Sequence, residues 1–340
     1  MKNLHPAQTR ASLAFLLSIP LFLTCVRAAP ASADTDIVLA VDGIKVVRNL
    51  PVLLAERLGF FKSEGLRVTL METAASAKVD EMLADGRVAG MVAYYHHTIV
   101  AQAEGRSCEA VITMAVTPGY ELLVANRLKA QVHSLADLKG KRIIAGGPHS
   151  AKSTTANMLL FNAGYALSDY TRLAPTDKAK IAAALKNDEA DFVIAPEPDA
   201  SFYEAQGVAS VFADMYSVAG TQRSLGTVFP STVLYMATPY ASAHPDLAQH
   251  LVNAFVRTLA YINTHTVAEI TALLPEIVAG DNLQPRVIEQ GMKMFACDGL
   301  MPDAAARMEA KAIIALFPEY GGVKIETTYT NQFVERAHTK

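Results

Sequence analysis

Glycines, hydroxyl groups and a lysine lie close together in residues 145–160, AGGPHSAKSTTANMLL, and groups of this kind bind phosphates and other anions. The stretch matches the nucleotide-binding P-loop pattern at Gly146, Lys152 and Ser153, but Ala151 stands where the pattern requires a second glycine. That glycine lets backbone N–H groups wrap around a phosphate in a conformation that a Cβ disfavours. The sequence therefore argues against nucleotide hydrolysis at this loop.

Two other interpretations of the same loop remain open. In the first, Ser150 or Ser153 only caps the N-terminus of the helix that follows. In the second, the free N–H groups of the first helical turn and the helix dipole point at an anionic ligand. The sequence alone does not choose between a cap and an anion site.

Aromatic and imidazole side chains follow a predicted buried strand over residues 88–94. Open α/β sheets bind ligands at the carboxyl ends of their strands, so we expect one of Tyr94, Tyr95 and His96 to contact a ligand. Packing of these rings beneath a hinge is the alternative. Neighbouring histidines of an extended strand point to opposite faces, which makes His96 and His97 poor ligands for one metal ion. No HExxH or CxxC motif occurs in the chain, and no zinc site is predicted.

Charged residues occupy two further loops. Arg48 and Asn49 precede a predicted helix, and Arg48 with Lys45 could bind an anion, unless both cations are simply solvated. Glu197 stands between two prolines after a buried strand, an extended turn that would aim it toward a cleft. A carboxylate there would repel an anion and favours a ligand with a donor or cationic group. The charge of the ligand therefore stays open.

The N-terminal 33 residues predict a secretory signal peptide. Basic residues precede an apolar run over residues 11–25, which is shorter than the roughly 20 residues of a membrane-spanning helix. Ala31-Ser32-Ala33 offers a cleavage site before Asp34. A lipid anchor at Cys25 is the alternative, although the residues before it lack the small-residue pattern expected for such an anchor. We expect export to the periplasm.

Composition excludes one large class of partners. The chain has 340 residues, enough for two domains, and a formal net charge of −3. Loss of the signal segment would remove three basic residues and no acidic one, which takes the charge to −6. Such a chain offers no basic field for nucleic acid. The mature chain would keep Cys108 and Cys297, which we expect to be two separate buried thiols, although an oxidising compartment permits a disulfide.

Strands and helices alternate along the chain and would position these residues. Predicted strands over residues 37–41, 67–71, 88–94 and 109–116 enclose predicted helices, an order typical of a mostly parallel sheet covered on both faces. From residue 121 the pattern restarts as a second, smaller α/β unit. After a strand from Val233 the chain continues as a helical C-terminal tail.

Several segments together resemble the substrate-binding proteins of ABC importers in the nitrate, sulfonate and taurine class, a group that also contains thiamine-pyrimidine binders. The resemblance covers residues 37–317. The segments that carry it are LPVLLAERLGFFKSEGLRVTL, AYYHHTIVAQAEG, SLADLKGKRI, AFVRTLAYINTH and CDGLMP.

The resemblance implies an α/β fold of the two-lobed periplasmic-binding-protein type (type II), with two mixed or parallel sheets, flanking helices and a helical C-terminal tail. Lobe one would comprise residues 34–125 and 220–340, and lobe two residues 126–219, with the lobes closing on one small molecule. Similar proteins hold their ligand with the loop between strand and helix discussed first. The contacts expected from that loop are Ser150, Ala151, Lys152, Ser153 and Thr154.

The function implied is periplasmic capture of a small polar or anionic organic molecule and its delivery to an ABC permease and the ATPase of that permease. Sulfonates, nitrate-like anions, aromatic carboxylates and pyrimidines are the candidate ligands. Such a protein is expected to be a monomer without a cofactor or metal and without enzymatic activity. The alternative is an enzyme on the same fold, similar to a pyrimidine synthase or to an enzyme of the menaquinone pathway.

Overall fold

The structure is a computed structural model that describes Met1 and residues 34–75, 77–274 and 285–339. The predicted signal segment and the alternative anchor at Cys25 lie outside the described residues. None of the described helices combines the length and the apolar composition that a membrane-spanning helix needs. The described residues from Asp34 onward form one compact unit that contains two sheets.

The first sheet has the strand order β2-β1-β3-β10-β4. Strand β1 runs parallel to β2 and β3, whereas β10 runs antiparallel to β3 and β4. Every residue of β3 and β10 is buried, as expected for strands covered on both faces. The strand bounds are Thr35–Val41 (β1), Leu66–Glu72 (β2), Gly90–Tyr94 (β3), Cys108–Thr113 (β4) and Thr232–Ala237 (β10).

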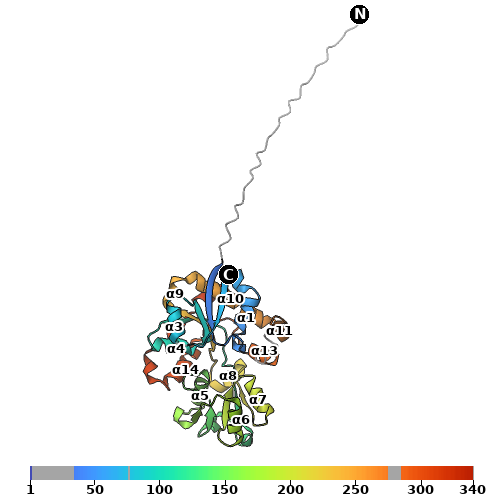
Figure 1. Ribbon diagram of the computed structural model, residues 1–340, viewed down its shortest axis with the longest axis vertical. Helices are drawn as coiled ribbons and strands as arrows, with labels where there is room; N and C mark the ends of the chain where they lie inside the picture. The colour runs from blue at the N-terminus through green and yellow to red at the C-terminus, as the bar shows by residue number, and fades with distance from the viewer. Residues whose placement is uncertain (2–33, 76, 275–284, 340) are drawn as a thin grey trace. The chain divides into compact units, whose positions relative to one another are not determined.

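Helices pack on both faces of this sheet (Figure 1). Side chains alternate along a strand, so Val92 joins the core beneath α1 and α10, while Met91 and Ala93 join the core beneath α3, α4 and α14. The helix bounds are Leu50–Arg57 (α1), Phe60–Ser63 (α2), Ala77–Ala84 (α3), His96–Ala103 (α4), Thr238–Ala243 (α9), Pro245–Thr264 (α10), Val267–Ala272 (α11), Pro285–Met292 (α13), Asp303–Ile314 (α14) and Gln332–His338 (α15).

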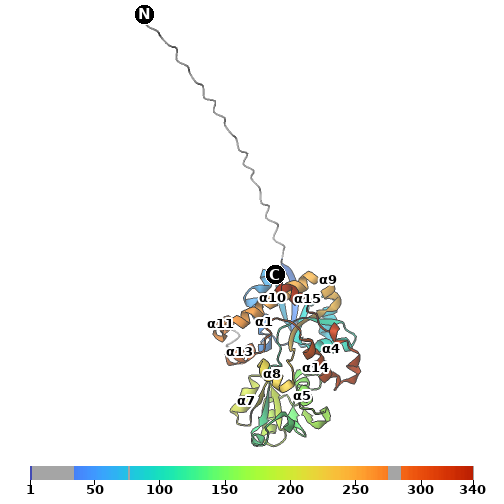
Figure 2. The same cartoon turned by 180° about the vertical axis from the view of Figure 1, so that it is seen from behind.

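The second sheet has the order β7-β6-β8-β5-β9, and α5, α6, α7 and α8 lie around it (Figure 1). Figure 2 shows α5, α7 and α8 beside the same sheet from behind. Strands β6, β7 and β8 are parallel, and β5 is antiparallel to β8 and β9. The bounds are Glu121–Ala125 (β5), Arg142–Ile144 (β6), Ala151–Asn162 (α5), Thr171–Leu173 (β7), Lys178–Lys186 (α6), Phe192–Ala195 (β8), Asp199–Ala205 (α7), Ala209–Asp214 (β9) and Val218–Leu225 (α8).

The strand pairing differs from the lobe boundaries expected from the sequence. Residues 121–125 were placed with lobe one, but they form β5, whose hydrogen-bonded neighbours are β8 and β9 of the second sheet. The expected return at residue 220 falls inside α8. Two backbone hydrogen bonds, from Phe229 N to Val116 O and from Ser231 N to Ala115 O (both 2.9 Å), join the two segments that cross between the sheets. We therefore propose that the second lobe spans residues 117–231.

Both cysteines of the described chain are free thiols. Cys108 is buried at the start of β4, and burial raises the pKa of its thiol to about 12. Cys297 is exposed, so the expectation of two buried thiols was wrong for this residue. It lies in the loop between α13 and α14, where the chain leaves the core: residues 294–296 are buried, whereas Cys297 and Asp298 are exposed.

Gly220 offers a test of packing near the crossing segments. It lies in the first turn of α8, where an added Cβ would overlap the backbone oxygen of Asp214 and lie 2.8 Å from Ser217 Oγ. We expect Gly220→Ala to lower the free energy of unfolding by about 1 to 3 kcal/mol, the usual cost of overpacking. Urea unfolding measures this change. Gly322→Ala is the matched control, because nothing lies within 4 Å of a Cβ at that position. Equal unfolding midpoints for the two variants would contradict the prediction.

Candidate ligand-binding site

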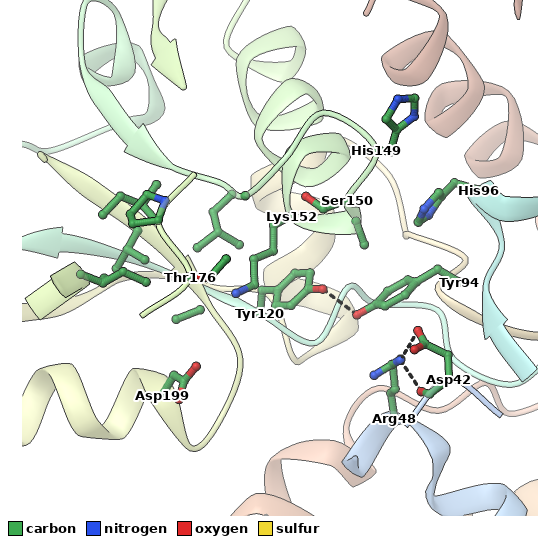
Figure 3. A pocket seen from close by; sticks show the side chains of 18 of the residues that line it. Asp42, Arg48, Tyr94, His96, Tyr120, His149, Ser150, Lys152, Thr176 and Asp199 are labelled. Atoms are coloured by element: carbon green, nitrogen blue, oxygen red, sulfur yellow. Dashed lines mark hydrogen bonds and ion pairs between the residues drawn. The ribbon is translucent and has the colours of Figure 1, made fainter. Parts of the chain in front are cut away.

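A cavity of about 490 Å³ lies among loops of both sheets (Figure 3). From the first sheet, loops after β1 and β3 contribute residues, and from the second sheet, loops after β6, β7 and β8 contribute others. These are the carboxyl ends of parallel strands, where open α/β sheets bind ligands. We call this space the main cavity. Its polar and aromatic lining includes Asp42, Arg48, Tyr94, His96, His97, Tyr120, His149, Ser150, Lys152, Thr176, Asp199 and Tyr203.

The loop before α5 is both a helix cap and a wall of the main cavity. Ser150 is the N-cap of α5, and its Oγ accepts a hydrogen bond from Ser153 N (3.2 Å) and donates one to Gly147 O (2.7 Å). Gly146 has φ +70°, and a Cβ there would lie 2.8 Å from Ser150 Oγ, so the turn requires glycine. The N–H groups of Ala151 and Lys152 belong to the first turn, which has no intrahelical acceptors for them. The two interpretations of this loop are therefore compatible.

Lys152 brings a positive charge to the main cavity. Its side chain is half-buried, and among the described residues it has no hydrogen-bond or ion-pair partner. Burial lowers the pKa of its ammonium group, while the charge of Asp199 acts in the opposite direction. In Figure 3 the side chain extends beside the ring of Tyr120. An anionic group of a ligand would give this ammonium group the partner that the protein does not provide.

Arg48 faces Lys152 from the other lobe, but its charge is already paired. Its Nη2 donates to the backbone oxygen and to Oδ2 of Asp42, both at 2.6 Å, and its guanidinium lies 4.9 Å from the centroid of the Tyr94 ring. Asn49 does not line the cavity: its side chain is buried and donates to the backbone oxygens of Asp42 and Gly43. Lys45 is exposed and lies away from the cavity lining.

A tyrosine pair joins the two lobes across the main cavity. The Tyr94 hydroxyl at the end of β3 donates to the Tyr120 hydroxyl at 2.8 Å, and the two rings stack with their centroids 6.4 Å apart (Figure 3). Tyr120 directly precedes β5 of the second sheet. The sequence analysis missed it, because the assignment of residues 121–125 to lobe one hid the crossing at this point.

The two adjacent histidines lie on the same side, contrary to the prediction from an extended strand. The strand ends at Tyr94 and α4 begins at His96, so successive side chains turn by about 100° rather than 180°, and the rings of His96 and His97 are 4.2 Å apart. Burial lowers the pKa of His97 to about 4. Within the described residues, no group of three or more His, Cys, Asp or Glu side chains is arranged to hold a metal ion.

Glu309 on α14 lies next to His96 and was not found from the sequence. Its side chain is fully buried, and its Oε1 is 3.9 Å from His96 Nδ1. Neither carboxylate oxygen and neither ring nitrogen has a hydrogen-bond partner among the described residues. Burial raises the pKa of Glu309 well above its ordinary value, and burial followed by the charge of His97 lowers the pKa of His96. Burial therefore favours the uncharged form of both groups.

Three predicted contact residues turn away from the main cavity. Tyr95 is fully buried with its hydroxyl against Thr328 Oγ1, because the backbone already turns toward the helix at this residue. Ser153 is buried and accepts from Arg172 Nη1 (3.1 Å). Thr154 is buried and its hydroxyl lies 3.5 Å from Ser150 O. Helical periodicity directs Ala151 and Lys152 to the cavity and the next two residues away from its lining.

Glu197 lines a neighbouring cavity of about 270 Å³ rather than the main one. Its carboxylate accepts from the backbone N (3.0 Å) and Oγ (2.6 Å) of Ser201 and lies 3.6 Å from Arg286 Nε. The charge of Glu197 is therefore compensated within the protein. From the sequence, Arg48 and Glu197 favoured ligands of opposite charge. In the structure, Asp42 pairs with Arg48, and Ser201 and Arg286 lie at Glu197, so neither charge needs a ligand as its partner.

Comparisons with known proteins agree with this architecture. A family model described as "NMT1/THI5 like" matches residues 48–268. A Schizosaccharomyces pombe protein named 4-amino-5-hydroxymethyl-2-methylpyrimidine phosphate synthase is 26% identical over 218 residues, which cover 62% of this chain and 60% of that protein. Both findings agree with the resemblance that the sequence segments indicated.

Two solved structures are similar over most of their length. A protein from Bordetella bronchiseptica RB50 is 27% identical, with a TM-score of 0.70 over 89% of this chain and 97% of that chain. The alkanesulfonate-binding protein SsuA from Xanthomonas axonopodis pv. citri, solved with MOPS bound, is 18% identical, with a TM-score of 0.61 over 88% of this chain and 100% of that chain. The predicted two-lobed α/β fold with two mixed sheets is confirmed.

Proposed function

Because the chain belongs to the NMT1/THI5-like family, we propose that it is a solute-binding protein that captures a small polar or anionic organic molecule between its lobes and delivers it to an ABC permease. The proposal includes export to the periplasm through the N-terminal segment and action as a monomer. The two-lobed fold shared with SsuA supports it.

The observation that carries the proposal is the position of Lys152. This unpaired cation and the first turn of α5 come from the second lobe, and they face the Arg48–Tyr94 wall of the first lobe across the main cavity. A ligand with an anionic group would contact both walls at once. A molecule that contacts both lobes binds the closed arrangement better than an open one, so its binding favours closure.

A ligand screen on the exported, processed protein tests this function. The panel comprises nitrate, methanesulfonate, taurine, benzoate and a hydroxymethylpyrimidine, and the readout is the thermal unfolding midpoint, followed by calorimetry. A ligand present at 100 times its Kd stabilises the native state by about 2.7 kcal/mol. We expect at least one member to bind and to be recovered unchanged.

The same screen includes a variant that blocks the cavity. Ala151 is 7% exposed and lines the main cavity, so Ala151→Leu should occupy the space of the ligand and abolish binding with little change in fold. Ala205→Leu, the same change at an exposed position of α7, is the matched control. Full affinity in Ala151→Leu would show that the loop is only a helix cap, and the site in the second lobe would have to be withdrawn.

An enzyme on the same fold is the second candidate, of a pyrimidine-synthase-like or menaquinone-pathway-like kind. The name of the S. pombe relative favours it, and so do the uncharged imidazoles of His96 and His97 in the cavity wall. Mass spectrometry after prolonged incubation with each ligand that binds in the screen separates the two functions, because a pyrimidine synthase forms a pyrimidine rather than consuming one. A solute-binding protein returns the ligand unchanged, whereas new product masses that the Ala151→Leu variant does not form would favour the enzyme.

A further inference from the structure

A second cavity of about 270 Å³ adjoins the main one, and we call it the side cavity. Arg48, Tyr94, Tyr120, Lys152 and Asp199 line both spaces, so the two cavities meet at these residues. The rest of the lining is mostly apolar or aromatic. It includes Val46, Val47, Pro118, Pro196, Tyr216 and Met294.

The apolar walls of the side cavity are held in place by packing. Tyr216 and Met294 are at most 1% exposed, and the Tyr216 hydroxyl accepts a hydrogen bond from Glu197 N at 2.6 Å. Gly119 has φ +67°, and a Cβ at this position would overlap Met294, so glycine lets the methionine approach the backbone. The hydrogen-bonded pair of Tyr94 and Tyr120 lies where the two cavities meet. The side cavity is therefore a formed space with rigid aromatic and proline surfaces.

Most charged residues that line the side cavity already have a partner within the protein, so an anion would find a free positive charge only where the side cavity meets the main one. Glu197 is bonded to Ser201 and lies near Arg286, and Asp199 lies 3.4 Å from Lys178 Nζ. Arg48 is paired with Asp42. Among the described residues that line the side cavity, Lys152 is the one charged group without a partner. A ligand that enters this space is thus expected to carry its charge at the junction and an uncharged body beyond it.

We infer that the ligand is an aryl anion; this inference rests on the proposed function. The acidic group of the ligand would lie at Lys152 and the first turn of α5, and one aromatic ring would lie in the side cavity. Flat proline faces, the Tyr216 ring and the Met294 thioether all pack favourably against an aromatic ring. Apolar protein cavities of about 150 Å³ already hold benzene, so the side cavity has room for a ring with a small substituent. A short alkyl anion would leave this apolar surface without a partner.

Calorimetry on matched pairs of anions tests the inference. The probes are benzenesulfonate against methanesulfonate, and benzoate against acetate, so that the acidic group is constant within each pair. We expect the aryl member of each pair to bind at least tenfold more tightly to the full processed chain. Val46→Phe should fill the side cavity and bring the aryl affinity to within about twofold of the alkyl affinity measured on the same variant.

Two further variants serve as controls for Val46→Phe. Val211→Phe makes the same change at an exposed position of β9 and should keep the aryl preference. Val46→Leu, a smaller change, should reduce the preference partly if Val46→Phe does not fold. Equal aryl and alkyl affinities in the unchanged protein would overturn the inference while the proposed function stands, and so would an aryl preference that survives in Val46→Phe. If no probe anion binds, the aryl anion is wrong, and the remaining panel of nitrate, taurine and a pyrimidine decides the proposed function separately.

Discussion

Lys152→Glu is expected to weaken the binding of an anionic ligand by about 100-fold or more. Loss of a charge partner in a desolvated site costs about 2 to 5 kcal/mol, and each 1.4 kcal/mol is a factor of ten in Kd. The reversed charge would in addition repel the ligand and lie near Asp199 in the cavity wall. Calorimetry with the tightest ligand from the screen measures the change.

Two variants show whether the effect is specific to this position. Lys180→Glu makes the same change of charge on the exposed face of α6 and should leave affinity within about twofold, since exposed charges are screened by salt. Lys152→Ala should weaken binding less than Ala151→Leu does, because backbone N–H groups of α5 still face the ligand. Unchanged affinity in Lys152→Glu would remove Lys152 from the site.

Glu309→Gln should make the protein more stable than the parent chain at neutral pH, and the difference should grow as the pH rises from 4.5 toward the folded pKa of Glu309. Burial raises the pKa of Glu309 above its ordinary value of 4.5, so above that pH the unfolded chain releases a proton that the folded chain keeps. The stability contributed by this residue is complete below pH 4.5 and falls by up to about 1.4 kcal/mol per pH unit as the pH rises toward the folded pKa. The amide in Glu309→Gln does not titrate.

Urea unfolding at several pH values measures this difference. Glu335→Gln, at an exposed position of α15, is the matched control and should follow the parent chain at every pH. The contribution of His96 to stability changes with pH in the opposite direction. Burial lowers its pKa, so below about pH 6.5 the unfolded chain takes up a proton that the folded chain does not, and stability falls as the pH falls. The Glu309 prediction is wrong if the parent chain and Glu309→Gln keep a constant difference in stability from pH 5 to pH 8.

The strands and helices, and many of the residues at which they end, could be predicted from the sequence alone. The uninterrupted apolar run of β3 and the helix from Pro51 were predicted, because each depends on residues close together in the chain. A cap of α5 at Ser150 or Ser153 was one of two open interpretations, and the structure has it at Ser150. Local periodicity and helix signals report such features directly. The order of strands and helices also indicated that ligand contacts would gather at the carboxyl ends of strands, where Arg48, Tyr94 and Lys152 now line one cavity.

Sequence patterns did not show which lobe holds β5, on which side His97 lies, or which charges are compensated. These features could be read only from the folded chain. Strand β5 joins the second sheet through β8 and β9, partners that lie about 70 to 90 residues further along the chain. Glu309 lies close to His96 in space, and Arg286 lies close to Glu197, although the two members of each pair are far apart in the sequence. Periodicity carries no information about contacts between distant segments. The charge of a site depends on those contacts, because burial and a neighbouring charge shift the pKa of a carboxylate or ammonium group.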